Sequence, residues 1–165
     1  MEVKNRSLII TDPCYVAKEE DWGSNFDWET NEIDPSLGFS DYLWVPSGYG
    51  DGSPVVFEID RDINLYKYFD EVSKARNNND DESLDELYSL RNDIDGYCMD
   101  AGCMCVFYLD EVEKYYPGFF DEYADHCYSI IEDFTGTVTD IEDEDGCYHF
   151  VLTPEDNSEP LIVTD

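Results

Sequence analysis

Tyr97-Cys98-Met99-Asp100-Ala101-Gly102-Cys103-Met104-Cys105-Val106-Phe107-Tyr108-Leu109 contains the most apolar run of this chain. After the Asp-Ala-Gly step no residue is charged, and alternate side chains from Cys103 to Leu109 point to opposite sides of an extended chain. Both sides are apolar, which is typical of a strand covered on both faces. In a chain this rich in carboxylates, the run predicts a strand at the centre of a sheet.

The totals indicate one folded domain. Of the 165 residues, 42% are hydrophobic and 15% aromatic, which argues against general disorder. No run of about 18 apolar residues occurs, so no membrane span is predicted. The residues from Met1 to Arg6 do not resemble the apolar core of a signal peptide, and the six Cys are therefore interpreted as reduced thiols. We expect a single cytoplasmic domain over residues 1–165, with no cofactor.

The net charge sets this chain apart. Nine Lys and Arg stand against 41 Asp and Glu, which gives −32, whereas small domains commonly carry a magnitude of roughly 2 to 8. A globule of this length is about 40 Å across, and about 40 Å of duplex DNA carries about two dozen negative charges. Direct binding to nucleic acid or to an anionic membrane is therefore excluded, and a strongly basic protein is the predicted partner.

The N-terminal half predicts strands and a helical pair. A short strand over 7–11 ends at Asp12-Pro13, and Trp22, Phe26 and Trp28 are expected to fix the next segment to the domain. Residues 42–45 and 55–59 predict a strand pair, because the intervening segment is rich in Gly and Pro. Helical periodicity follows over 62–77, and then over a second helix that Ser83 and Glu86 would open as a capping box.

The C-terminal half predicts two short helices and a meander. The helices are expected over 110–116 and 119–125, and the strands over 127–134, 136–141 and 147–152, with Glu144-Asp145-Gly146 as the last turn. The predicted fold class is α+β, a mainly antiparallel sheet with two to four short helices in a single domain. Residues 62–93 are interpreted as a helical insertion.

Three short motifs carry a resemblance: Asp12-Pro13-Cys14-Tyr15, Gly50-Asp51-Gly52 and Asp100-Ala101-Gly102. Together they resemble a family of small proteins carried by phages and mobile elements, from which no activity can be transferred. The resemblance implies a phage setting. In size and charge the chain also resembles the class of DNA-mimic proteins, such as anti-restriction and anti-CRISPR inhibitors.

The C-terminal region supplies the candidate docking residues. No Lys or Arg follows Lys114, whereas fourteen Asp or Glu do. Residues i and i+2 of a strand share a face, about 6.7 Å apart, so a row of carboxylates could replace successive phosphates. The alternative is an ordinary solvated face. The predicted partner-binding residues are Asp121, Glu122, Asp125, Asp140, Glu142, Asp143, Glu144 and Asp145.

A second candidate site is a carboxylate cluster. Asp12, Asp51 and Asp100 each belong to a turn motif that contains Gly or Pro, and three converging turns could hold Mg²⁺ or Ca²⁺. Ordinary turn chemistry, with each Asp accepting nearby N–H groups, is the alternative. Zinc is not predicted, because the Cys and His residues lack a C-x₂-C pair.

Several tyrosines lie among carboxylates: Tyr49, Tyr115, Tyr116 and Tyr123. If exposed, they would suit an Arg-rich surface through cation–π contacts. The leading hypothesis is therefore a non-enzymatic, phage-type inhibitor that mimics nucleic acid and blocks the basic site of a CRISPR effector or restriction nuclease. The alternatives are an immunity protein against a basic nuclease toxin, a ligand-binding domain built on the three Asp residues, and adaptation to high salt.

Overall fold

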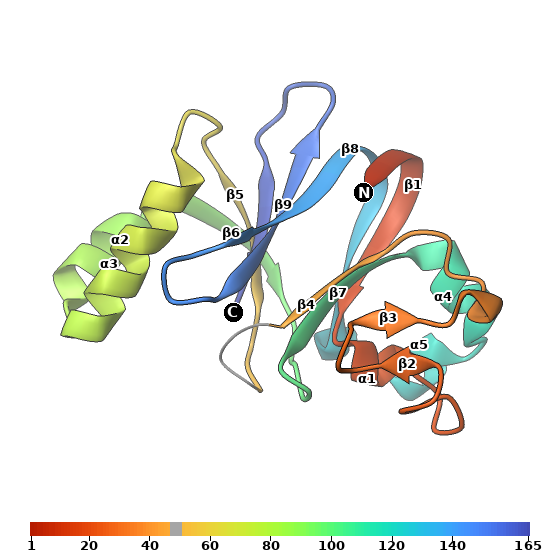
Figure 1. The fold of residues 1–165 in the computed structure, drawn as a ribbon. Coiled ribbons are helices and arrows are strands. Elements are labelled where there is room, and N and C mark those ends of the chain that lie inside the picture. Colours follow the sequence, from red (N-terminus) through yellow and green to blue (C-terminus); the bar gives the residue numbers. More distant parts are fainter. Residues whose placement is uncertain (47–50) are drawn as a thin grey trace.

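Eight antiparallel strands form one sheet in the computed structural model, which describes residues 1–46 and 51–165 (Figure 1). The strand order is β4 (Leu43–Pro46), β7 (Cys103–Tyr108), β1 (Glu2–Thr11), β8 (Tyr128–Glu142), β9 (Tyr148–Pro154), β10 (Leu161–Thr164), β5 (Val55–Ile59) and β6 (Arg91–Gly96). The α+β prediction is confirmed.

Two groups of smaller elements lie at opposite ends of this sheet (Figure 1). One group packs on the β1–β7 end and comprises α1 (Pro13–Val16), β2 (Phe26–Asp27), β3 (Glu32–Ile33), η1 (Pro35–Leu37), α4 (Leu109–Tyr115), α5 (Phe119–Glu122) and η2 (Asp125–Cys127). The other group is α2 (Leu65–Asn78) and α3 (Asp81–Tyr88). No helix in residues 1–46 and 51–165 is long and apolar enough to cross a bilayer.

Side-chain alternation divides the core into three clusters. One face of the sheet encloses a cluster to which β1, β5, β7, β8, β9 and β10 all contribute, so the sheet curls around it. On the opposite face, one cluster lies under the β2–β3 group and another under α2 and α3. In β1, for example, Leu8 and Ile10 enter the enclosed cluster while Ile9 packs outward, and all three are fully buried.

The apolar run is covered on both faces, as predicted, but it is not central. Met104 and Val106 belong to the enclosed cluster, and Cys105 and Phe107 belong to the outer one. However, β7 is the second strand from one edge, between β4 and β1. The layer of small elements at this end buries the outer face of β7, and the middle positions fall to β8 and β9.

The predicted C-terminal meander is corrected in one respect. Residues 128–142 form one strand, β8, which pairs first with β1 and then with β9. Gly136 marks the change of partner, because it lies opposite both Val3 and Pro154. A Cβ atom at Gly136 would lie 2.1 Å from the carbonyl oxygen of Thr153, so only glycine fits this close approach.

The predicted pairing of residues 42–45 with 55–59 is wrong. β4 pairs with β7, and β5 pairs with β10 and β6, near the other edge of the sheet. β4 and β5 therefore lie near opposite edges of the sheet and do not form a hairpin, although a Gly- and Pro-rich segment separates them in the sequence. Residues 47–50 of that segment, including Tyr49 and Gly50, lie outside the described residues.

The helical pair begins at caps that differ from the prediction. Asn64 caps α2, and Asp80 caps α3 by accepting from the Ser83 N–H at 3.1 Å, so Ser83 is not the cap. Arg91 then fastens the pair to the sheet, since its guanidinium lies 4.2 Å from the ring centre of Tyr88 and 5.0 Å from that of Phe57. The interpretation of residues 62–93 as an insertion stays a prediction.

Candidate functional site

The predicted docking residues fall into two separate groups. Asp121 and Glu122 lie on α5 and Asp125 in η2, at one end of the molecule (Figure 1). Asp140, Glu142, Glu144 and Asp145 lie at the β8–β9 turn, which contacts α2 at the other end. All seven side chains belong to exposed residues. The predicted row of hairpin acids and the predicted helical patch are therefore two separate surfaces.

Asp143 is not a surface residue, which corrects its place among the docking residues. Its side chain is 2% exposed. Oδ1 accepts from the N–H groups of Asp145 and Cys147, each at 2.9 Å. Oδ2 lies 3.3 Å from Ser73 Oγ and 3.3 Å from His149 Nε2. Asp143 therefore holds the β8–β9 turn against α2 and is not available to a partner.

The three Asp-containing turns meet, but their carboxylates do not. Gly52 and Met99 exchange backbone hydrogen bonds of 3.0 and 3.1 Å, which brings the second and third motifs together. Asp12 is fully buried and accepts from the N–H groups of Cys14, Asp100 and Ala101 at 2.8, 2.9 and 2.6 Å. Burial raises the pKa of Asp12, and these hydrogen bonds oppose that rise.

This geometry favours turn chemistry over a metal site. The Asp12 oxygens are occupied by backbone donors, and Asp51 is exposed. Across the described residues, no group of three or more His, Cys, Asp or Glu side chains is placed to hold a metal ion. The Asp12, Asp51 and Asp100 cluster is therefore withdrawn as a ligand site, and Asp12 is a structural junction of three turns.

A different group of acids forms a groove of about 520 Å³ at the bend of β8. Phe134, Pro154 and Leu161 supply its apolar lining. Six carboxylates also line it, from β5, from β8 and from the loop between β9 and β10: Glu58, Glu132, Asp133, Glu155, Asp156 and Glu159. We call this set the acidic groove.

A bulge in β8 explains why two successive acids face this groove. The register of β8 against β1 shifts around Arg6, and Asp133 adopts a left-handed conformation with φ of 50°. A bulge breaks the two-residue alternation of a strand. As a result Glu132 and Asp133 are both exposed, although neighbours in a regular strand point to opposite faces.

Half of the carboxylates in the groove are free of internal partners. Glu58 accepts from Asn92, Asp156 from Ser158 and Glu159 from the Arg61 N–H. The hydrogen bonds from Ser158 lower the pKa of Asp156. By contrast, within the described chain no hydrogen bond or ion pair engages the side chains of Glu132, Asp133 and Glu155. These three are the groups that can receive a cation from outside.

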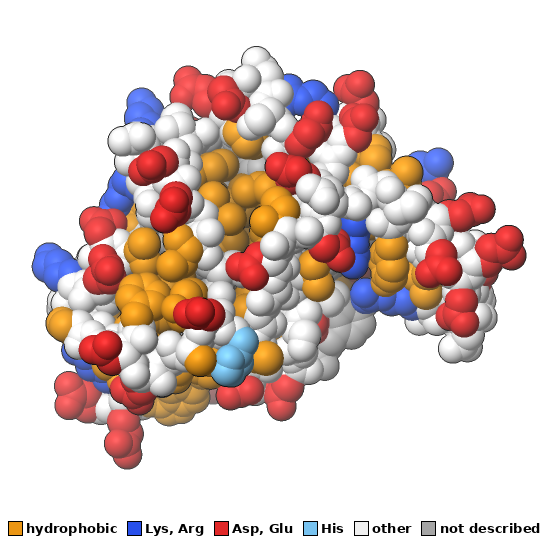
Figure 2. Space-filling model, turned by 180° about the vertical axis from the view of Figure 1, so that it is seen from behind, with side chains coloured by type: hydrophobic (Ala, Val, Ile, Leu, Met, Phe, Trp, Pro, Cys, Tyr) orange, Lys and Arg blue, Asp and Glu red, His pale blue; other side chains and the backbone are white. Residues whose placement is uncertain are grey.

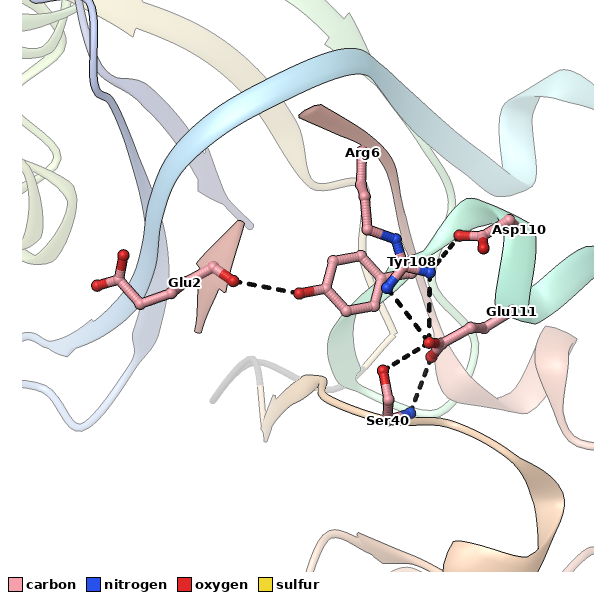
Figure 3. Close-up of polar contacts among 6 residues, drawn as sticks. All are labelled: Glu2, Arg6, Ser40, Tyr108, Asp110 and Glu111. Atoms are coloured by element: carbon pink, nitrogen blue, oxygen red, sulfur yellow. Dashed lines mark hydrogen bonds and ion pairs between the residues drawn. The ribbon is translucent and has the colours of Figure 1, made fainter. Parts of the chain in front are cut away.

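Most of the few cations of the protein contact acids or aromatic rings of the same chain. Figure 3 shows Arg6 held between Asp110 and Glu111, with its guanidinium 3.4 Å from the ring centre of Tyr108. Glu111 in turn accepts from the Ser40 N–H at 2.9 Å and from its hydroxyl at 2.6 Å (Figure 3). Internal ion pairs, hydrogen bonds or ring contacts also engage Lys18, Arg61, Lys67, Lys74, Arg76 and Arg91.

No family model, curated protein or solved structure matches this chain.

The acidic groove was missed by the sequence reasoning, although one signal pointed toward it. Every acid of the groove except Glu58 follows Lys114, in the region without Lys or Arg. The sequence favours the hairpin instead, because Asp140, Glu142 and Glu144 alternate along one face of a predicted strand. The bulge at Asp133 and the approach of the 154–160 loop to β8 depend on pairing between distant segments, which no local pattern reveals.

Proposed function

We propose that this protein is an acidic inhibitor that occupies the nucleic-acid-binding site of a basic protein, such as a CRISPR effector or a restriction nuclease. One observation carries the proposal: the protein has a net charge of −32, and most of its cations are engaged internally. Carboxylates would take the place of phosphates, and long-range attraction would speed association.

The distribution of charge supports a large docking surface. Residues 61–91 carry five Lys or Arg and eight Asp or Glu, which leaves −29 on the rest of the chain. Figure 2 shows acidic side chains spread over one face and its rim, with hydrophobic side chains gathered between them. Acids are therefore spread over a broad area of this face. The acidic groove combines free carboxylates with an apolar lining, and an apolar centre surrounded by polar groups is typical of protein interfaces.

Inhibition assays with purified nucleases test this proposal. The protein is titrated into cleavage reactions of several restriction endonucleases and CRISPR effectors at two concentrations of duplex DNA. Competitive inhibition predicts that the half-inhibitory concentration of the protein rises as the concentration of DNA rises. It also predicts weaker inhibition at higher salt. Inhibition that is indifferent to both, or its absence across the panel, would refute the proposal.

Two triple variants locate the contact. E132Q/D133N/E155Q removes the free carboxylates of the groove, and E82Q/D85N/E86Q removes three exposed carboxylates of α3. Each variant removes three negative charges, so both reduce the magnitude of the net charge equally. If the groove makes direct contact, the first variant weakens inhibition about tenfold more than the second, since close charge pairs contribute more than distant ones. Equal effects would mean that the groove has no special role.

A further inference from the structure

A second pocket combines aromatic rings with acids. The segment after α1 and residues of α5 line it, and these two helices lie at one end of the molecule (Figure 1). Its volume is about 610 Å³. Its lining includes Lys18, Glu19, Glu20, Trp22, Tyr116 and Glu122, and we call this set the aromatic–acid pocket. It brings the predicted docking residue Glu122 beside Tyr116, one of the tyrosines that the sequence placed among carboxylates.

Trp22 is the exposed end of a row of three indole rings, each in contact with the next. Trp22 is 47% exposed, and its ring centre lies 4.5 Å from that of Trp28. Trp28 in turn packs edge-on against the buried Trp44, at 4.8 Å. The sequence predicts that Trp22 packs into the domain, whereas in the structure its ring contacts Trp28 on one side and remains about half exposed.

Hydrogen bonds hold the tyrosine side of the pocket. The Tyr116 hydroxyl donates to Glu122, and this bond raises the pKa of Tyr116 to about 12. The neighbouring Tyr115 hydroxyl donates to Asp21 and accepts from the Lys18 N–H at 3.2 Å. The Tyr116 ring and the Glu122 carboxylate are therefore held in place before any partner arrives, which reduces the entropic cost of binding.

The pocket already holds a cation that the chain itself supplies. The Lys18 ammonium lies 4.4 Å from the ring centre of Tyr115 and 5.9 Å from that of Tyr116. These distances are within the range of cation–π attraction. Lys18 leaves the Trp22 ring and the exposed Glu19 and Glu20 carboxylates open to solvent. The site thus suits a positive charge that lies against aromatic rings.

We propose that the aromatic–acid pocket receives an arginine side chain of the basic partner. A planar guanidinium can stack on Trp22 while it donates hydrogen bonds to a carboxylate, whereas an ammonium cannot stack in this way. This inference rests on the proposed function, because it presumes a basic partner. It adds a defined anchor to an otherwise diffuse attraction, and single aromatic anchors commonly dominate an interface.

A capped tetra-arginine peptide is the probe. Its binding is monitored at low salt by NMR titration, through the indole N–H resonances of the protein. The Trp22 resonance is expected to shift, while that of the buried Trp44 stays in place. A capped tetra-lysine peptide should bind more weakly. W22A should weaken binding of the arginine peptide about tenfold. The matched control is Y66A, which removes an aromatic side chain on α2 that is 64% exposed.

Two charge comparisons separate local contact from net charge. E122Q should weaken peptide binding about fivefold more than D121N, which removes the same charge from the adjacent exposed residue. K18M should strengthen binding about threefold relative to K4M, because it removes the resident cation of the pocket.

The outcomes of these titrations distinguish failure of the pocket inference from failure of the proposed function. If the peptide binds but each variant equals its control, the pocket is not the anchor, and the nuclease assays still decide the general proposal. If the peptide does not bind, the pocket inference is refuted on its own. If the pocket variants lose peptide binding while wild-type protein inhibits no nuclease, the pocket inference holds and the proposed function fails.

Discussion

Protonation of His149 is expected to destabilise the fold as the pH falls from about 6.5 to about 4. His149 is 4% exposed and lies flat against Phe69, with ring centres 3.7 Å apart. Nδ1 is 2.7 Å from Thr164 Oγ1, and Nε2 is 3.3 Å from Asp143 Oδ2. Burial lowers the pKa of His149 to about 4, although Asp143 opposes this change.

The sign and size of the effect follow from proton linkage. The folded protein holds this proton less tightly than the unfolded chain, whose His has the ordinary pKa of 6.5. The contribution of His149 is therefore complete above pH 6.5 and is lost as the pH falls through the folded pKa of about 4. At about 1.4 kcal/mol per pKa unit, the loss in unfolding free energy is about 3 kcal/mol.

Carboxylates in general titrate near the lower end of this window, so the His149 effect must be isolated by difference. This difference is measured by urea unfolding of wild type and H149Q between pH 7 and pH 4. The stability advantage of wild type over H149Q should shrink by about 3 kcal/mol across the range. NMR titration gives the pKa directly, with H126Q to assign the two imidazole resonances. A constant difference, or a measured pKa at or above 6.5, would refute the reasoning.

Three further predictions concern stability measured by urea unfolding. R6M should cost about 1 to 2 kcal/mol, because it removes the ion pairs to Asp110 and to the largely buried Glu111 and the ring contact with Tyr108, whereas K4M, an exposed cation two residues earlier, should cost less than about 0.5 kcal/mol. D12A should cost about 3 kcal/mol or more or prevent folding, because three backbone donors lose their acceptor, and D51A should be nearly neutral. G136A should cost about 3 kcal/mol, because its Cβ would collide with the backbone of β9, and a cost below about 1 kcal/mol would contradict the close approach described for this position.

The sequence predicts well whatever depends on short-range pattern. The alternation from Cys103 to Leu109 is found on the two faces of β7, and Pro117-Gly118 separates α4 from α5 as expected. The β8–β9 hairpin turns at the predicted Glu144-Asp145-Gly146. These features depend on period and on turn chemistry, which neighbouring residues determine.

Features that depend on distant partners were not predictable. The edge-side position of β7 follows from where α1, α4 and the β2–β3 pair pack. Asp143 resembles its acidic neighbours in the sequence, yet contacts from Ser73 and His149 make it an internal residue. The acidic groove likewise arises from a bulge and a loop brought together by pairing.

Competition with DNA tests the central claim most directly. A nuclease that the protein inhibits is bound to fluorescently labelled duplex DNA, and the protein is added at 50 and at 200 mM salt. The account predicts that the protein displaces the DNA completely, at one site, and that its affinity falls by about tenfold or more between the two salt concentrations. A ternary complex of nuclease, DNA and protein, with an affinity independent of salt, would contradict it.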